Sequence, residues 1–453
     1  MSAPPVGTAA HADRSSGEAP FTLTEPAPSG LGLRDTFGLW ANLGISLLLP
    51  VAAAFVVLAG RPLGVTVLAI AVGSVIGAVL LGLTAAPAAR ERVPAMVMMR
   101  GLLGRRASYL PTALNVLQCA GWATFEIVVI AEAASRALDA PRWPFVLAAG
   151  TLATAMAMRP LGVVRVLARY AVWAALAAVA YLFARVLREP LTPVTEGGAG
   201  SFWSAVDIVI ALPVSWFPLA ADYTRHARDP RTAFLGSAGG YGAANFVMFT
   251  LGVLALAAYG AVGLDVIDAL LAVPLGLLAV LVLVTVEVDE AFANIYSTAV
   301  STQNVVSRLD RRVMALLVGL TATTLALTLD VVAYEPFLFL LGAVFVPLAG
   351  VFLVAYHLLP RGAWDVSDDA PARLPLLLPW AAGFVAYQLT TPTFFFGFGA
   401  GWTSWWAARQ EDLGISAASG LSASIVSLTV ASLLTVAVAL PGALRARRAV
   451  ASS

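Results

Sequence analysis

Lysine is absent from this sequence, and cysteine, histidine and charged residues of both signs are scarce. All 27 basic residues are arginines, and charged residues make up only 12% of the 453 positions. A soluble domain has about twice that share of charged residues. Because 60% of the residues are hydrophobic, the composition excludes an ordinary soluble domain and indicates a protein embedded in a lipid bilayer.

The scarcity of cysteine and histidine also excludes several kinds of site. Cys119 is the only cysteine, so the chain forms neither an internal disulfide nor a thiolate metal site. His11, His226 and His357 lie in the N-terminal tail or at the ends of apolar segments, which argues against a buried histidine-based catalytic centre. The net charge of +1 gives no sign of nucleic-acid binding. We therefore expect no cofactor or metal, no nucleic-acid partner and no enzymatic activity.

Long apolar runs, in contrast, follow one another along most of the chain. A helix needs about 20 apolar residues to cross a bilayer. The sequence predicts an all-α polytopic membrane protein with twelve such spans: 38–59, 64–86, 109–133, 143–159, 163–184, 204–222, 235–262, 268–299, 313–330, 335–357, 374–391 and 417–441. No soluble domain is inserted between them.

The arginines predict how these spans are oriented. With the N-terminus inside, 21 of the 27 arginines fall in segments on the cytoplasmic side. We therefore expect both termini in the cytoplasm and the protein in a bacterial inner membrane. Residues 1–35 are rich in Ser, Pro, Ala and Gly and lack the apolar core of a signal peptide, which predicts a disordered cytoplasmic tail. Residues 444–453 are predicted to form a short cytoplasmic C-terminal tail.

Two spans have helix breakers in their interior. Gly44 and Pro50 interrupt the first span, and Pro213 and Pro218 interrupt the sixth. A broken helix persists in a membrane where its freed backbone groups line a cavity or are buried in protein. Interrupted spans at corresponding positions of two halves indicate the binding site of an inverted-repeat transporter. Because the two spans are offset by five, the second copy would be inverted.

The segment "VTVEVDEAFANIYS" carries the most unusual residues of the chain. Glu287, Asp289 and Glu290 stand in an apolar run, where each acid at mid-membrane depth costs about 2.5–3.5 kcal/mol. No arginine lies in the middle of a predicted span, so an ion pair at that depth is not available. These carboxyl groups must carry a proton, or meet a cation or a polar ligand. The alternative is a polar helix with a purely structural role.

Two further spans carry polar and aromatic residues suited to a flat ligand. Gln118, Trp122 and Glu126 follow one another at intervals of four and share a helix face. An indole between an amide and a carboxyl group suits a planar ligand with hydrogen-bonding edges. Ser215 and Trp216 lie between the two prolines of the sixth span.

Several motifs resemble one family. "SWFPLAADYTRHARDPR" and "EAFANIYSTAVSTQN" resemble the sixth and eighth helices of the nucleobase–cation symporter-1 family, which includes permeases for cytosine, purines, hydantoin and allantoin. "LWANLGIS" and "LQCAGW" resemble its first and third helices, and "MMRGLLGRRASYLP" resembles its cytoplasmic R-x-x-x-G turn.

The resemblance implies a five-plus-five inverted repeat, with broken helices 1 and 6 and two additional C-terminal helices, within a transmembrane domain at 36–443. The repeats would cover about 38–187 and 204–358, and the last two helices 374–441. It also implies uptake of a small planar nitrogen heterocycle together with Na⁺ or H⁺. We further expect the protein to act as a monomer. The substrate-binding residues would be Gln118, Trp122, Glu126, Ser215, Trp216, Glu290 and Asn294. The residues for cation or proton coupling would be Asn42, Gly44, Ile45, Asp289 and Glu290.

This sequence departs from the family pattern in the eighth helix. Asp289 and Glu290 stand where sodium-coupled members carry hydroxyl residues, which favours a proton as the coupling ion. A carboxyl group also pairs well with an amino-pyrimidine edge, so cytosine or hydroxymethylpyrimidine is expected rather than uracil or hydantoin. Two alternatives stay open: an amine or amino-acid symporter of the same fold and, more remotely, an intramembrane enzyme.

Overall fold

The computed structural model describes residues 19–23, 27–195, 197–329, 334–358, 364–393, 399–415 and 420–451. Within these residues the chain is almost entirely helical, and the one β-type pairing is an isolated bridge between Leu31 and Ala227. The all-α architecture predicted from the apolar runs is therefore confirmed for the described part of the chain.

The helices of the first half begin after a short N-terminal segment. They are α1 (Leu33–Leu43), α2 (Leu48–Val56), α3 (Leu63–Glu91), α4 (Ala95–Leu103), α5 (Tyr109–Leu138), α6 (Arg142–Met158), α7 (Pro160–Val166), the π-helical turn η1 (Leu167–Ala171) and α8 (Val172–Val186). The second half contains α9 (Phe202–Ser215), α10 (Ala220–Thr224), α11 (Pro230–Tyr259), α12 (Asp265–Ala272), α13 (Gly276–Thr302), α14 (Arg311–Thr328) and α15 (Tyr334–Leu358). The C-terminal part contains η4 (Leu374–Leu376), α16 (Leu377–Thr390), α17 (Gly399–Asp412) and α18 (Ala423–Ala451).

Both predicted breaks are present. The axis bends by 65° between α1 and α2, and residues 44–47 connect the two helices. Residues 216–219 separate α9 from α10; Pro213 lies in the last turn of α9 and Pro218 lies within the connection. Gly44 is required at the first break because a Cβ there would lie 2.8 Å from the Cβ of Ala244 on α11. Proline causes the second break because it offers no backbone donor to continue the helix.

Three details differ from the prediction. The expected span 268–299 is two helices, because α12 ends before Val273 and Pro274 and α13 begins after Leu275, whose φ is +56°. Helices α4, α12 and α17 are short elements that the run of apolar spans did not predict. Helix α18 continues to Ala451, so it extends through most of the segment predicted as a short C-terminal tail.

Fewer spans meet a strict length-and-hydropathy test than the twelve expected. In the described residues seven helices are long and apolar enough to cross a membrane, or eight if the bent pair α1–α2 counts as one span. Helices α9 and α16 are apolar but shorter.

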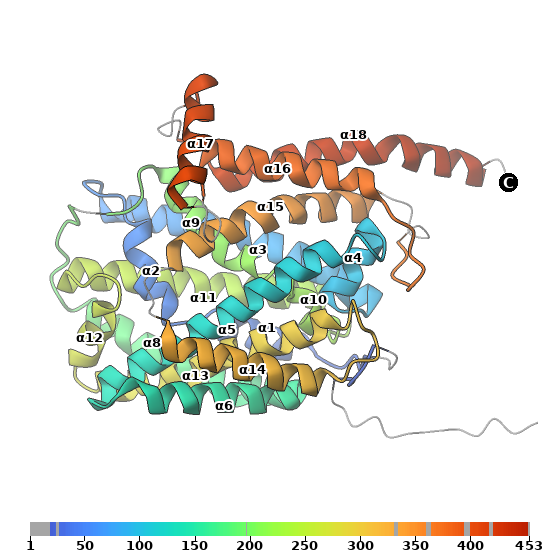
Figure 1. Cartoon of the computed structure of the whole chain (residues 1–453). Coiled ribbons are helices and arrows are strands. Elements are labelled where there is room, and N and C mark those ends of the chain that lie inside the picture. Colours follow the sequence, from blue (N-terminus) through green and yellow to red (C-terminus); the bar gives the residue numbers. More distant parts are fainter. Residues whose placement is uncertain are drawn as a thin grey trace, which may run out of the picture.

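The helices pack in a pattern that repeats with an offset of five spans. Helix α1 packs on α11, and α9 packs on α3; α3 and α11 also pack on each other. In the same way α5 packs on α14 and α13 on α6, while α5 packs on α13 and α6 on α14. Helices α15, α16 and α18 form a layer along one side, and α6 and α14 lie on the opposite side (Figure 1).

The described part of the N-terminal segment is held against the helices, in contrast to the predicted disorder through residue 35. The Arg311 guanidinium donates to the carbonyls of Ala19 and Pro20, at 3.1 and 3.0 Å. The Gln303 amide donates to the Phe21 carbonyl at 2.6 Å. Further along, the amides of Gly30 and Leu31 donate to the His226 carbonyl at 3.0 Å. Residues 1–18 and 24–26 lie outside the described residues.

Candidate functional site

A small internal cavity lies where the break of the sixth span meets α5, α11 and α13. Its lining residues are Trp122, Leu212, Ser215, Trp216, Leu219, Tyr241, Glu290 and Asn294. Five of the seven residues that the sequence predicted for substrate binding are among them. The cavity has room for about one water molecule at its centre, so a larger ligand requires the surrounding helices to separate.

The break between α9 and α10 places an aromatic group at the cavity. The Trp216 indole N–H donates to the Tyr241 hydroxyl at 3.0 Å, which fixes the orientation of the ring. Trp40 of α1 packs edge-on against Trp216, with ring centroids 5.6 Å apart and an interplanar angle of 81°. The two broken spans are thus in contact through their tryptophans.

Helix α5 contributes the residues on the next side. Trp122 lines the cavity and packs edge-on against Phe337 of α15, at a centroid distance of 5.4 Å. The Gln118 amide donates to Asn115 Oδ1 at 2.9 Å and to the Ser215 carbonyl at 3.2 Å. Gln118 therefore joins α5 to the break of the sixth span, and it does not line this cavity. The Ser215 hydroxyl donates to the Leu212 carbonyl of its own helix at 2.7 Å.

Two carboxyl groups of α13 bind the other break. Glu287 Oε1 accepts from the Ser46 hydroxyl at 2.5 Å, and Oε2 accepts from the Leu47 amide at 2.8 Å. These donors lie at the N-terminus of α2, where unpaired amide groups favour a negative charge. Two residues along, Asp289 accepts a hydrogen bond from the Asn42 side-chain amide. Asn42 and Asp289, predicted as coupling residues, are therefore in direct contact.

The other two residues predicted for coupling at the first break have structural contacts. The Asn42 carbonyl accepts from the Ile45 amide at 3.0 Å, and the Ile45 side chain is buried. Gly44 permits the close approach of α11 described above. In the described residues no group of three or more His, Cys, Asp or Glu side chains has the geometry of a metal site.

Glu126 and Glu290 form a second pair of acids beside the cavity. Both Glu126 oxygens and Oε1 of Glu290 are buried and receive no hydrogen bond from a protein donor among the described residues. The two carboxyl groups are neighbours, and Glu287 lies next to Glu126. On the following turn of α13, the Asn294 side-chain amide donates to the Glu290 carbonyl at 3.0 Å.

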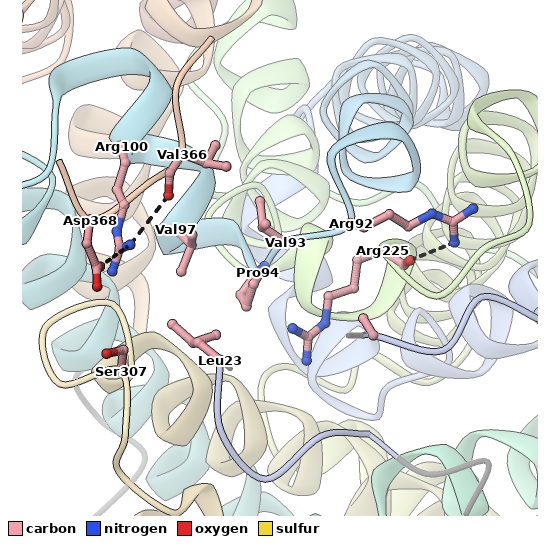
Figure 2. A pocket seen from close by; sticks show the side chains of 11 residues that line it. Leu23, Arg92, Val93, Pro94, Val97, Arg100, Arg225, Ser307, Val366 and Asp368 are labelled. Atoms are coloured by element: carbon pink, nitrogen blue, oxygen red, sulfur yellow. Dashed lines mark hydrogen bonds and ion pairs between the residues drawn. The ribbon is translucent and has the colours of Figure 1, made fainter. Parts of the chain in front are cut away.

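A larger cavity of about 240 Å³ lies at the end of the molecule that carries α4, which we call the α4 end (Figure 2). Arg100 and Asp368 form an ion pair of 2.7 Å at one side of it, and Arg225 lies at the other side. Arg100 also donates to Asn304 Oδ1 at 2.6 Å. Arg100 and Gly104 form the R-x-x-x-G turn, and Gly104 ends α4 with φ +85° in close contact with Pro371. This cavity is separate from the central one.

Sequence reasoning missed three residues of the central site. Trp40 and Tyr241 position the Trp216 ring, and Ser46 binds Glu287. The signal for Trp40 and Ser46 was present, because both lie in the "LWANLGIS" motif around the first break. Tyr241 had no comparable signal, because it is one aromatic residue in a long apolar helix.

Comparison with protein families now identifies the chain. Residues 31–373 match the family of permeases for cytosine and purines, uracil, thiamine and allantoin. The chain belongs to this permease family. It is therefore a multi-pass membrane protein and a transporter of nucleobase-type substrates rather than an enzyme. No curated protein matches its sequence.

Solved structures show that the fold is shared with known transporters. The closed, bromovinylhydantoin-bound structure of Mhp1, a nucleobase-cation-symport-1 family transporter, has 17% sequence identity and a TM-score of 0.67 over 93% of this chain and 94% of that chain. A Na⁺-coupled sialic acid symporter has 10% identity and a TM-score of 0.62 over 90% of each chain. The manganese transporter of Eremococcus coleocola has 15% identity and a TM-score of 0.58 over 92% of this chain and 98% of that chain. At these identities the likeness concerns the fold alone.

Proposed function

We propose that this permease is a symporter that imports a planar nitrogen heterocycle with a donor-rich edge, such as cytosine or hydroxymethylpyrimidine, coupled to H⁺ or Na⁺. The observation that carries the proposal is the cavity at the break of the sixth span, where Trp122 and Trp216 provide aromatic rings and Glu290 and Asn294 provide hydrogen-bonding groups. Rings recognise the faces of a planar heterocycle, and the polar groups recognise its edge.

In this proposal the substrate site, with its supporting residues, is formed by a defined set: Gln118, Trp122, Glu126, Ser215, Trp216, Glu290 and Asn294. Gln118 acts on the substrate through the Ser215 carbonyl that it binds. Carboxyl groups accept hydrogen bonds from N–H groups, so an amino-pyrimidine edge complements Glu290 better than the carbonyl-rich edges of uracil or hydantoin.

Coupling is assigned to the first break and to α13. Asn42, Gly44 and Ile45 belong to the broken part of the first span, and Asp289 binds Asn42. This contact joins α1 to α13 and would connect ion binding to helix movement, so its loss would uncouple the two. We favour a proton as the coupling ion because carboxyl groups stand where hydroxyl groups would serve Na⁺.

We also propose twelve spans, with a five-plus-five inverted repeat, two further helices and both termini in the cytoplasm of a bacterial cell. The exchanged packing of α1 on α11 and of α9 on α3 supports the repeat. The arginine-rich α4 end would be the cytoplasmic one, because arginine is enriched in cytoplasmic loops. We propose that the protein acts as a monomer.

Uptake into proteoliposomes tests the function. An imposed pH gradient and an imposed Na⁺ gradient are applied one at a time, with cytosine as the probe. We expect accumulation driven by the pH gradient, and we expect Asp289→Asn to transport without coupling to it. Accumulation driven by Na⁺ alone and retained in Asp289→Asn would contradict proton coupling. Accumulation driven by neither gradient would contradict symport.

A second candidate is an amine or amino-acid symporter, because four buried acids would also neutralise a cationic ligand. Thermal-shift measurements of the detergent-solubilised protein distinguish the two. We expect stabilisation by cytosine or hydroxymethylpyrimidine. Stabilisation by amines or amino acids alone would favour the second candidate.

A further inference from the structure

Four carboxyl groups are gathered around the central cavity and have two kinds of surroundings. Glu126, Glu287 and Asp289 are completely buried and Glu290 is 6% exposed. Glu287 and Asp289 each receive hydrogen bonds from donors around the first break. Their negative charge is therefore partly balanced by the protein itself, at the N-terminus of α2 and at the Asn42 amide.

Glu126 and Glu290 lack such donors. Oε1 and Oε2 of Glu126 and Oε1 of Glu290 are buried without a hydrogen bond from any donor group of the described residues. In the described part of the chain, the titratable groups that face this pair are acidic or phenolic: Glu287 and Asp289 on α13, and Tyr241 on α11. Among the described residues neither acid forms a salt bridge.

Two neighbouring carboxyl groups that are buried without donors in a low-dielectric interior are not both ionised at neutral pH, because their like charges repel each other strongly there. One proton between them removes the repulsion and supplies the hydrogen bond that the unpartnered oxygens lack. The pair then carries one negative charge, and Glu290 presents it to the cavity.

We propose that Glu126 and Glu290 share a single proton in the resting transporter and accept one further positive charge with each substrate. The class of substrate follows from this charge. A neutral heterocycle with N–H donors enters with a second proton, which comes from the same side of the membrane. A cationic amidine-type heterocycle brings the charge itself. The uptake of a positive charge with each substrate, which is the second part of the proposal, rests on the proposed function. The proton shared in the ligand-free protein does not.

Infrared spectroscopy of the ligand-free protein tests the shared proton. The carbonyl stretch of a protonated carboxyl group is distinct from that of a carboxylate, and its assignment needs no substrate. We expect the wild-type spectrum at pH 7 to contain a protonated-carboxyl band that disappears in the double variant Glu126→Gln/Glu290→Gln. Glu132→Gln is the matched control, because Glu132 lies on the same helix α5 but is 24% exposed and paired with Arg136. A spectrum without such a band, or a band that the double variant retains, overturns the shared proton.

Proton counting tests the second part. Calorimetric titration of cytosine in two buffers with different ionisation heats gives the number of protons taken up with each bound ligand. We expect one proton in the wild type and none in the double variant, which should still bind cytosine more weakly. Proton uptake that the double variant retains and Asp289→Asn loses would assign the charge to Asp289 and overturn this part.

The two proposals fail in distinguishable ways. A wild-type protein that shows the protonated-carboxyl band but is not stabilised by cytosine or hydroxymethylpyrimidine supports the shared proton and contradicts the proposed substrate. If the protein binds these probes without any proton uptake, the proposed substrate class is supported. The proposal that one positive charge is taken up with each substrate is then overturned. The infrared comparison also applies to each single Gln variant, should the double variant not fold.

Discussion

At the scale of single residues, Trp122 is the clearest test of the cavity. Its ring lines the cavity and is held by Phe337. An aromatic contact contributes about 0.5–1.5 kcal/mol beyond area burial, so we expect Trp122→Ala to weaken cytosine binding by about 2–10-fold. Trp380→Ala is a control for loss of a tryptophan, because Trp380 bonds the Val344 carbonyl away from the cavity. Unchanged affinity in Trp122→Ala would place the ligand elsewhere.

Asn294 is expected to recognise the substrate edge. The side-chain amide bonds the carbonyl of Glu290 one turn earlier, which positions the side chain at the cavity. Asn294→Ala should leave ligand groups unpaired, which costs about 1–3 kcal/mol and lowers affinity about 5–150-fold without unfolding the protein. Binding and thermal unfolding are measured on the same sample. Wild-type affinity would remove Asn294 from the site.

His226 gives a pH-dependent stability at the α4 end. It is 1% exposed, and burial, followed by the charge of Arg225, lowers its pKa to about 3. In the unfolded chain the imidazole has its ordinary pKa of about 6.5 and binds a proton first. The folded protein should therefore lose up to about 1.4 kcal/mol per pH unit as pH falls from about 6.5 towards 3. We expect His226→Gln to have a shallower decline in melting temperature between pH 7 and pH 5. An identical decline would assign the acid sensitivity to other groups.

The sequence predicted the site residues to different degrees, for physical reasons. Glu290 and Asn294 were predictable because an acid or an amide in an apolar span is costly and requires a reason. Tyr241 was not, because a tyrosine in a membrane helix has no such cost at the sequence level. The pairing of Glu287 with Ser46 joins residues 241 positions apart, and only the fold brings them together.

At the scale of elements, helix breaks were predictable where proline or glycine stands inside a long apolar run, as at Pro213. The end of α12 was not predicted, although Pro274 marks it, because the apolar run continues through the turn. Apolar periodicity indicates that a segment is buried, but it does not separate two short helices from one long helix. The short helices α4 and α17 were missed for another reason: both lie between predicted spans, and each is too short to cross a bilayer.

The contact between the first break and α13 can be tested with Ser46. Its hydroxyl donates to Glu287 at 2.5 Å and accepts from the Leu48 amide at 3.2 Å. Ser46→Ala should leave a buried carboxyl group with one fewer donor and lower stability by about 1–3 kcal/mol. Thr285→Ala is the control, because the exposed Thr285 hydroxyl bonds only the Leu281 carbonyl of its own helix. Equal melting temperatures for both variants would show that the break does not depend on this bond.

At the scale of the whole molecule, the N-terminal segment connects groups of helices that are distant in sequence. Arg311, at the start of α14, donates to the carbonyls of Ala19 and Pro20 and also to that of Ala157 at 2.9 Å at the end of α6. The guanidinium is completely buried, and its centre lies 5.6 Å from the centroid of the Tyr296 ring on α13. One side chain thus joins the segment to α6, α13 and α14.

Replacing this side chain should loosen the whole α4 end. Each hydrogen bond to a charged group contributes about 1.5–3 kcal/mol, so Arg311→Gln is expected to lower stability by at least about 3 kcal/mol. Because the segment loses its donors, limited proteolysis within residues 19–31 should also become faster. Arg308→Gln is the matched control: Arg308 is exposed on the loop that leads into α14, and its loss changes the net charge equally. Equal melting temperature and equal proteolysis in the two variants would show that the segment is held without Arg311.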